Sequence, residues 1–197
     1  MKPKPSQPRR RRFLKTAAAA AASGALASCG RSGSSWRFFT AHEARTVEAA
    51  SERLIPTDQD PGAAWAGVVR YIDRQLAGHF NFRTFRELYR QGLAGIDQTS
   101  AAMFRARFIN LTADQQAEVL KALEKGTPPG ETWKQVPPRR FFDALLNHTM
   151  QGYYGDPRHG GNRDGVGWRA LGLPPTLVRG REQHDLRQLP RAAGGAS

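Results

Sequence analysis

Three observations in the amino-acid sequence predict an all-α fold: an irregular bundle of about five helices, followed by a long glycine-rich C-terminal loop. Apolar side chains recur at three- and four-residue spacing in five segments, which is the period of an amphipathic helix. No segment alternates apolar and polar residues for long, and no Asn-Gly or Asp-Gly pair separates two apolar runs, as a β-hairpin would require. The helical segments are short and their connections contain proline, which favours an irregular bundle over a coiled coil.

The chain of 197 residues divides into three parts by composition. Residues 1–35 form a basic, alanine-rich leader, residues 36–178 carry the helical periodicity, and residues 179–197 have the composition of a disordered tail. The formal net charge is +13, but much of it comes from the leader, which contains no acidic residue. Because no basic stripe with interleaved aromatic residues follows, we expect a mildly basic solvated surface and no binding of nucleic acid.

The first helix is expected over residues 40–55. Thr40 and Glu43 have the spacing of a capping box, and Val47 lies on the apolar face of the helix that follows. Pro56 ends this helix because a proline restricts the residue before it to extended backbone.

The second helix is expected over residues 60–76, with Asp60 as its N-cap and Pro61 at the first helical position. Its apolar stripe consists of Trp65, Val68, Val69, Ile72 and Leu76.

Three further helices complete the bundle. One covers residues 82–97 and extends toward Phe104. The next covers residues 111–126, with a second capping box at Thr112 and Gln115, and Gly126 as its stop. The last covers residues 137–154 and starts near Pro138. Its packed side consists of Phe142, Leu145, Leu146, Thr149 and Tyr153.

The leader contains the most specific motif of the chain. Residues 10–15 read RRRFLK, and this segment resembles the twin-arginine export signal through Arg10, Arg11, Phe13, Leu14 and Lys15. The weakly apolar stretch that follows, residues 16–27, is too short to span a bilayer as a helix. The motif therefore predicts export to the periplasm in the folded state. The alternative is an ordinary basic region that happens to be rich in arginine.

A second signal in the leader concerns membrane attachment. Residues 26–29 read LASC and resemble a lipobox, in which Cys29 would be lipidated. Cys29 is the sole cysteine, so no disulfide can form within the chain, and lipidation would account for its presence. The alternative is ordinary cleavage after Ala27, because residues 25–27 also fit the A-x-A pattern.

Residues 156–168, DPRHGGNRDGVGW, are too rich in glycine for a helix or a plain strand. No strand precedes them and no G-K-[ST] follows, which argues against a phosphate-binding loop. The spacing of Asp156, Asn162 and Asp164 does not fit a calcium loop. We therefore expect a folded, exposed loop, fixed by Asx hydrogen bonds and suited to docking. The alternative is a self-packed surface loop without a partner.

No catalytic or metal site is expected in this chain. Its histidines are His42, His79, His148, His159 and His184. No two of them lie three or four residues apart, as a helical zinc site requires, and His148 is expected to be structural. No G-x-S-x-G motif is present. The competing hypothesis is a metal-dependent enzyme that uses His148, His159 and nearby acidic residues.

Two segments resemble the gluconate 2-dehydrogenase subunit 3 family. Residues 38–76 resemble its F-x-T-x-x-E…I-P-x-x-x-x-P-G-A…Y-I-D pattern. Residues 148–174 resemble its H-x-x-x-G-x-x-x-D-P-x-Y-G-G-N…G-W…G-x-P pattern, with His159 in place of the usual aromatic residue. The resemblance spans nearly the whole predicted domain, and the twin-arginine leader agrees with it.

The resemblance implies a non-catalytic small subunit of a membrane-associated periplasmic dehydrogenase. The catalytic partner would be a flavoprotein of the glucose–methanol–choline type, which holds the FAD and oxidises gluconate or a related sugar. A cytochrome c subunit often accepts the electrons, and the twin-arginine translocase would export the folded pair. This chain would bind no cofactor itself. The hypothesised docking residues are Asp156, Pro157, His159, Gly160, Gly161, Asn162, Gly167 and Trp168. The rival hypothesis is a free-standing exported helical lipoprotein or binding module.

Overall fold

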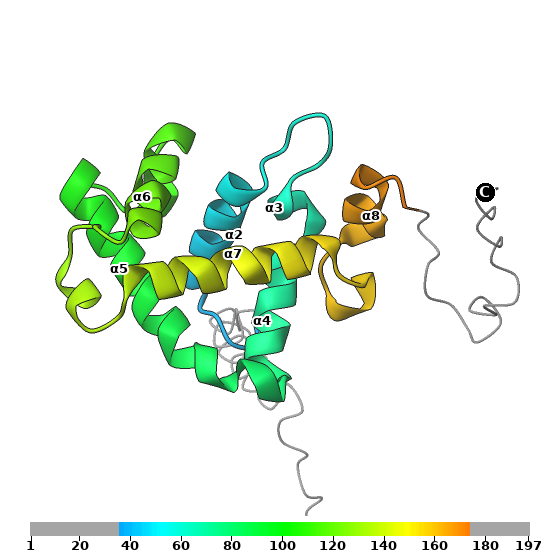
Figure 1. Ribbon diagram of the computed structural model, residues 1–197, viewed down its shortest axis with the longest axis horizontal. Helices are drawn as coiled ribbons and strands as arrows, with labels where there is room; N and C mark the ends of the chain where they lie inside the picture. The colour runs from blue at the N-terminus through cyan, green and yellow to red at the C-terminus, as the bar shows by residue number, and fades with distance from the viewer. Residues whose placement is uncertain (1–35, 174–197) are drawn as a thin grey trace, which may run out of the picture. The chain divides into compact units, whose positions relative to one another are not determined.

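The computed structural model describes residues 36–173, and within them every regular element is helical, so the all-α prediction is confirmed. The leader motifs at Arg10, Arg11, Phe13, Leu14, Lys15 and Cys29 and the tail at residues 179–197 lie outside the described residues. The α-helices of Figure 1 are α2 Ala41–Leu54, α3 Ala63–Ala66, α4 Val68–Gly78, α5 Arg86–Phe104, α6 Ala113–Lys125, α7 Pro138–Tyr154 and α8 Val166–Ala170. None of the described helices is both long and apolar enough to cross a membrane.

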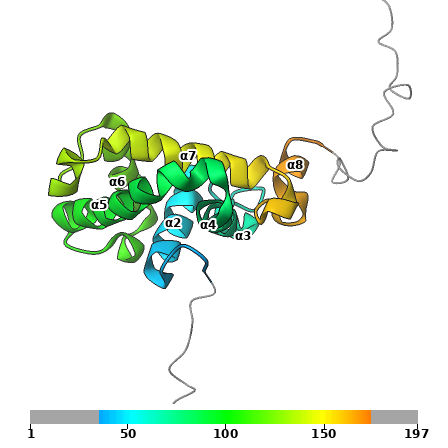
Figure 2. The ribbon, with the colours of Figure 1, turned by 90° about the horizontal axis from the view of Figure 1, so that it is seen from below.

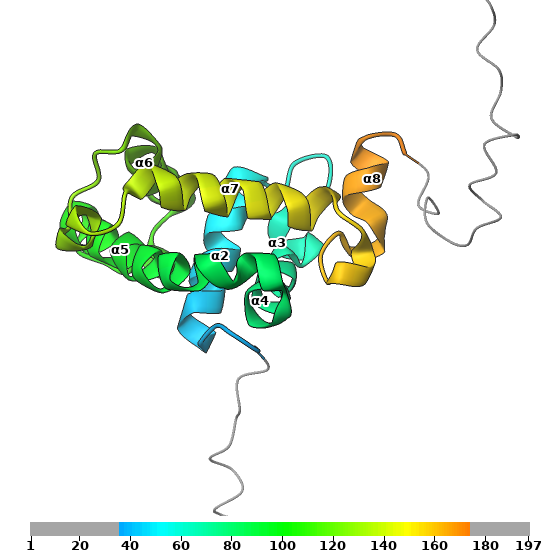
Figure 3. The same cartoon turned by 60° about the horizontal axis from the view of Figure 1, so that its bottom comes forward.

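Helix α7 is the central element of the bundle. It packs against α2, α4 and α6, and its C-terminal end meets α3 and α8. Figure 2 and Figure 3 show it running along the helices that come before it in the chain. The side chains at the centre are fully buried and come from every long helix: Val47, Ile72, Leu76, Tyr89, Ile96, Leu123, Phe141 and Leu145. Burial of this apolar surface drives the helices together.

Local sequence signals set the ends of several helices as expected. The capping boxes at Thr40 and Glu43, before α2, and at Thr112 and Gln115, before α6, are both formed. Gly126 ends α6 in the left-handed conformation, with φ of 79°. The third predicted helix does extend to Phe104, but α5 begins only at Arg86. Its expected start lies instead in a 3-10 segment, η1 Phe80–Phe85.

The single helix predicted over residues 60–76 is wrong. Gly67, with φ of 76°, takes the left-handed conformation and divides this segment into α3 and α4. The N-cap of α3 is Gly62 rather than Asp60, and the Glu52 carboxylate accepts the N–H of Ala64 at 2.9 Å. The break turns α3 away from the direction of α4, so Trp65 is 39% exposed and does not join the core.

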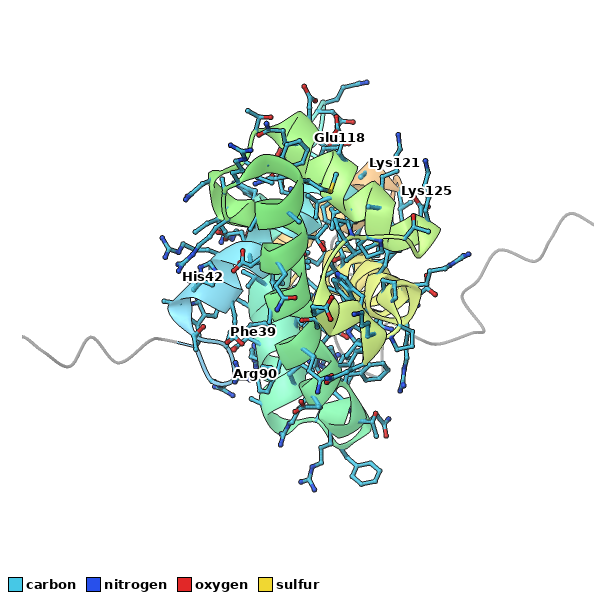
Figure 4. All side chains as sticks on the ribbon, turned by 90° about the vertical axis from the view of Figure 1, so that its left-hand side faces the viewer. Phe39, His42, Arg90, Glu118, Lys121 and Lys125 are labelled. Carbon is cyan, nitrogen blue, oxygen red and sulfur yellow. The ribbon has the colours of Figure 1, made fainter. Side chains whose placement is uncertain are left out.

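The entry of the chain into the domain is held by a buried carboxylate. Asp73 on α4 accepts the backbone N–H groups of Arg37, Phe38 and Phe39 at 2.8, 2.9 and 2.9 Å. The guanidinium carbon of Arg90 on α5 lies 4.2 Å from the Phe38 ring centre, and its Nη2 donates to the Phe38 backbone carbonyl at 2.6 Å. Figure 4 shows Phe39 and Arg90 close together on this side of the domain. The residues that follow the leader are thereby fixed to the folded core.

Arg90 also forms an ion pair with Glu43, the N3 residue of the capping box that begins α2. Burial by itself raises the pKa of Glu43, but the hydrogen bonds from Arg90 and Thr40 hold that pKa below its usual value. The F-x-T-x-x-E segment is therefore a structural unit that joins α2, α4 and α5.

Candidate functional site

The glycine-rich segment contains more regular structure than its sequence predicts. It forms two 3-10 turns, η4 Pro157–His159 and η5 Arg163–Gly165, and then the short helix α8. The expectation that no helix forms here is therefore wrong for Val166–Ala170. The glycines supply the left-handed backbone between these turns, as at Gly160 and Gly165, with φ of 109° and 69°.

Asn162 connects the two ends of this segment. Its side chain is completely buried, and its backbone takes the left-handed conformation with φ of 46°. The Nδ2 group donates to the carbonyl of Gly155 at 2.7 Å, and Oδ1 accepts the N–H of Gly167 at 2.8 Å. Asparagine suits this position because it tolerates the left-handed region and has both a donor and an acceptor.

The segment also caps the C-terminal end of α7. Trp168 Nε1 donates to the carbonyl of Tyr154 at 2.8 Å, and Asn162 bonds that of Gly155. Carbonyl groups at a helix C-terminus have no partner within the helix, so these two side chains supply one. A Cβ at Gly161 or at Gly167 would collide with a backbone carbonyl of α7. Both positions therefore require glycine for close packing.

The structure changes the interpretation of the hypothesised docking residues. The loop was expected to be exposed, but Gly161, Asn162 and Gly167 are buried within this chain and hold the segment together. Pro157, Gly160 and Trp168 are half-buried, and His159 is exposed. A docking role for the surface residues of the segment stays a prediction.

Asp156 also has a local role. Its carboxylate accepts the N–H of Arg158 at 2.9 Å and pairs with the guanidinium of that residue at 2.7 Å. These hydrogen bonds from Arg158 lower the pKa of Asp156. Because the carboxylate caps the turn η4, the D-P pair of the signature starts this turn.

A pocket of about 650 Å³ with a mixed polar and apolar lining lies between η1 and α7. Its wall contains Asn81, Phe82, Phe85, Arg140, Asp143, Ala144, Asn147, His148 and Gln151. The His148 side chain packs between aromatic rings, with ring centres 4.5 Å from Phe82 and 4.8 Å from Phe85.

His148 is 4% exposed and bonds through Nδ1 to the hydroxyl of Tyr89 at 2.9 Å. Burial lowers the pKa of His148 to about 4, so the ring is neutral near pH 7. The Tyr89 hydroxyl has no other acceptor among the described residues, so it donates to Nδ1. His148 Nε2 then carries the hydrogen. The structural role expected for His148 fits this environment.

The other described histidines lie in separate environments. His42 Nε2 is 2.5 Å from Asp97, His79 accepts the N–H of Asn81 at 3.3 Å, and His159 is exposed. His184 lies outside the described residues. Within residues 36–173 no three His, Cys, Asp or Glu side chains are grouped as metal ligands would be. The metal-dependent alternative therefore gains no support from this part of the chain.

Sequence reasoning missed several residues that position these features. Asp73 and Arg90 were not singled out, although Asp73 ends the quoted Y-I-D pattern, and Tyr89 was expected only as an apolar residue of the third helix. A buried aspartate on the apolar side of a helix is a signal that could have identified it, because such a group needs a partner. Tyr89 and Arg90 carry no comparable signal, since their partners lie on other helices.

Comparison with known proteins gives one family. The model of the family described as gluconate 2-dehydrogenase subunit 3 matches residues 41–175, more than half of the chain. No curated protein and no solved structure matches the chain. The matched range contains helices α2 to α8 and the glycine-rich segment that caps α7.

Proposed function

Because the chain belongs to the gluconate 2-dehydrogenase subunit 3 family, we propose that it is the non-catalytic small subunit of a periplasmic, membrane-associated flavoprotein dehydrogenase. In this proposal the partner is a catalytic subunit of the glucose–methanol–choline type that holds FAD and oxidises gluconate or a related sugar. A cytochrome c subunit accepts the electrons. The small subunit assists maturation of the flavoprotein and its export by the twin-arginine translocase.

One observation supports this role most directly: the glycine-rich segment is held by hydrogen bonds within the chain yet keeps polar and charged side chains in solvent. Asn162 and Trp168 fix it to α7 through hydrogen bonds, while Arg158, His159, Arg163 and Asp164 are exposed. A surface that is already ordered loses little conformational entropy when a partner binds. These exposed residues are therefore a suitable contact surface for the catalytic subunit.

The hydrogen bonds that the Asp73 carboxylate accepts support the export part of the proposal. They hold Arg37, Phe38 and Phe39, which directly follow the leader at residues 1–35. The leader is thereby joined to a segment that Asp73 on α4 binds through three hydrogen bonds. Such a link suits a route that carries folded proteins.

Fractionation of cells that express the tagged chain with its flavoprotein tests the export role. The variant Arg10→Lys/Arg11→Lys should leave both proteins in the cytoplasm, whereas Lys2→Gln/Lys4→Gln, outside the motif, should not. A flavoprotein that reaches the periplasm normally beside the arginine variant would contradict an escort role. Flavin content of the cytoplasmic pair reports maturation separately from transport.

A further inference from the structure

Three arginines from two separate elements lie around two glycines that approach each other, Gly67 and Gly160. Arg70 and Arg74 lie one turn apart on α4, and Arg163 belongs to η5. A Cβ placed on Gly160 would lie 3.0 Å from Nη1 of Arg74. One placed on Gly67 would lie 3.9 Å from Nη2 of Arg163 and 3.5 Å from the Gly160 carbonyl oxygen. The Cδ of Arg70 lies 4.0 Å from the same Cβ position on Gly67, so the side chains of all three arginines border one small area of surface.

These arginines have no acidic partner among residues 36–173. The arginines that form ion pairs there are Arg90 and Arg158, and within the same residues the three around Gly67 and Gly160 form no side-chain hydrogen bond. Like charges held close together repel one another, and none of these three arginines forms an ion pair with a carboxylate of the described residues. Such a group is complementary to a surface that supplies carboxylates.

An exposed tryptophan adjoins the arginines. Trp65 is 39% exposed, and the Arg163 guanidinium carbon lies 5.2 Å from its ring centre. Tryptophan and arginine are the residues most enriched at the energetic centres of protein interfaces. A lipid or nucleic-acid surface would call for a broader basic area, whereas here the acidic side chain of Asp164 follows Arg163 directly.

The backbone beneath this surface is held in place. Gly67 takes the left-handed conformation between α3 and α4, and Gly160 takes it between η4 and η5. Asn162 fixes η5, which carries Arg163, to the end of α7. Since both supporting turns are ordered, binding here requires only side-chain ordering.

We propose that Trp65, Arg70, Arg74 and Arg163, the Trp65–arginine patch, are the docking surface for an acidic segment of the flavoprotein subunit. Carboxylates of that segment bind the guanidinium groups, and an apolar side chain packs on Trp65. This inference rests on the proposed function and assigns the contact to a surface formed by α3, α4 and η5 together. The glycine-rich segment contributes Arg163, and Asn162 holds the turn that carries it.

The test measures binding between the purified chain and its flavoprotein. The variant Arg70→Glu/Arg74→Glu should weaken the wild-type affinity by about 100-fold, as expected when charge pairs at an interface are reversed. The matched control is Lys121→Glu/Lys125→Glu on α6, which changes the charge equally at two exposed lysines (Figure 4). The control should bind within about threefold of wild type. Trp65→Ala tests the apolar contact, and the wild-type affinity should fall as salt is raised.

The outcomes separate this inference from the proposed function. If the wild-type chain does not bind the flavoprotein, the proposed function itself fails. If the wild type binds and the arginine variant binds equally well, only the docking surface is wrong. Circular dichroism of each variant shows whether the helices persist, and Arg70→Gln/Arg74→Gln provides a milder change should the glutamate variant unfold. If Arg70→Glu/Arg74→Glu loses binding to phosphatidylglycerol vesicles but still binds the flavoprotein, the patch would be assigned to a lipid surface and the proposal overturned.

Discussion

Replacement of Asn162 by alanine should destabilise the chain strongly. The substitution removes both side-chain hydrogen bonds, to Gly155 and to Gly167. The Gly167 N–H is buried and would lose its acceptor, at a cost of about 1–3 kcal/mol. Alanine in the left-handed conformation costs roughly 1–2 kcal/mol more. Because Gly155 is half-buried, water can reach its carbonyl, so we expect a total loss of about 3 kcal/mol.

Urea unfolding followed by circular dichroism measures this loss. The variant Asn162→Gly removes the same side chain but fits the left-handed backbone, so it should recover about 1 kcal/mol relative to Asn162→Ala. The exposed Asn147→Ala serves as control and should change stability by less than about 0.5 kcal/mol. Hydrogen exchange at the Gly167 amide should lose its protection in Asn162→Ala. A loss of stability below about 1 kcal/mol would refute the assignment of Asn162 as the connection between the two ends of the segment.

Three further substitutions follow from the same structure. Asp73→Ala leaves three backbone N–H groups without an acceptor and should lower the free energy of unfolding by about 3 kcal/mol, and an unchanged urea midpoint would contradict this. His148 has a pKa of about 4 when folded, below that of the unfolded chain, so its contribution is complete above about pH 6.5 and is lost as the pH falls toward 4. Over that range the free energy of unfolding of His148→Gln should therefore fall by about 3 kcal/mol less than that of the wild type, as measured by unfolding curves at several pH values. Gly161→Ala forces a Cβ against the Gly152 carbonyl and should cost about 2 kcal/mol, seen as a lower melting temperature.

Features of the fold that depend on neighbouring residues could be predicted from the sequence. The capping boxes at Thr40 and Thr112 and the stop at Gly126 each involve residues within one or two turns, and the structure contains all three. The division at Gly67 was missed because a glycine inside an apolar pattern is also tolerated within a helix. In the structure Gly67 takes the left-handed conformation between α3 and α4, and Trp65 lies at the surface.

The candidate site was less accessible to sequence reasoning. The composition of residues 156–168 indicated turns and Asx hydrogen bonds, and Asn162 does bond backbone groups. Its burial, however, depends on packing against the end of α7, which the sequence pattern does not indicate. The approach of Arg163 to Trp65 joins residues nearly a hundred positions apart, and such a pair follows only from the folded arrangement.

Gentle affinity purification of the tagged chain from its native host, followed by an absorbance spectrum and identification of what accompanies it, tests the central claim most directly. We predict a flavin spectrum and one stoichiometric large partner of the glucose–methanol–choline type, with the flavin on that partner after the two are separated. A colourless chain that purifies alone would contradict the accessory-subunit proposal and favour a free-standing exported helical module.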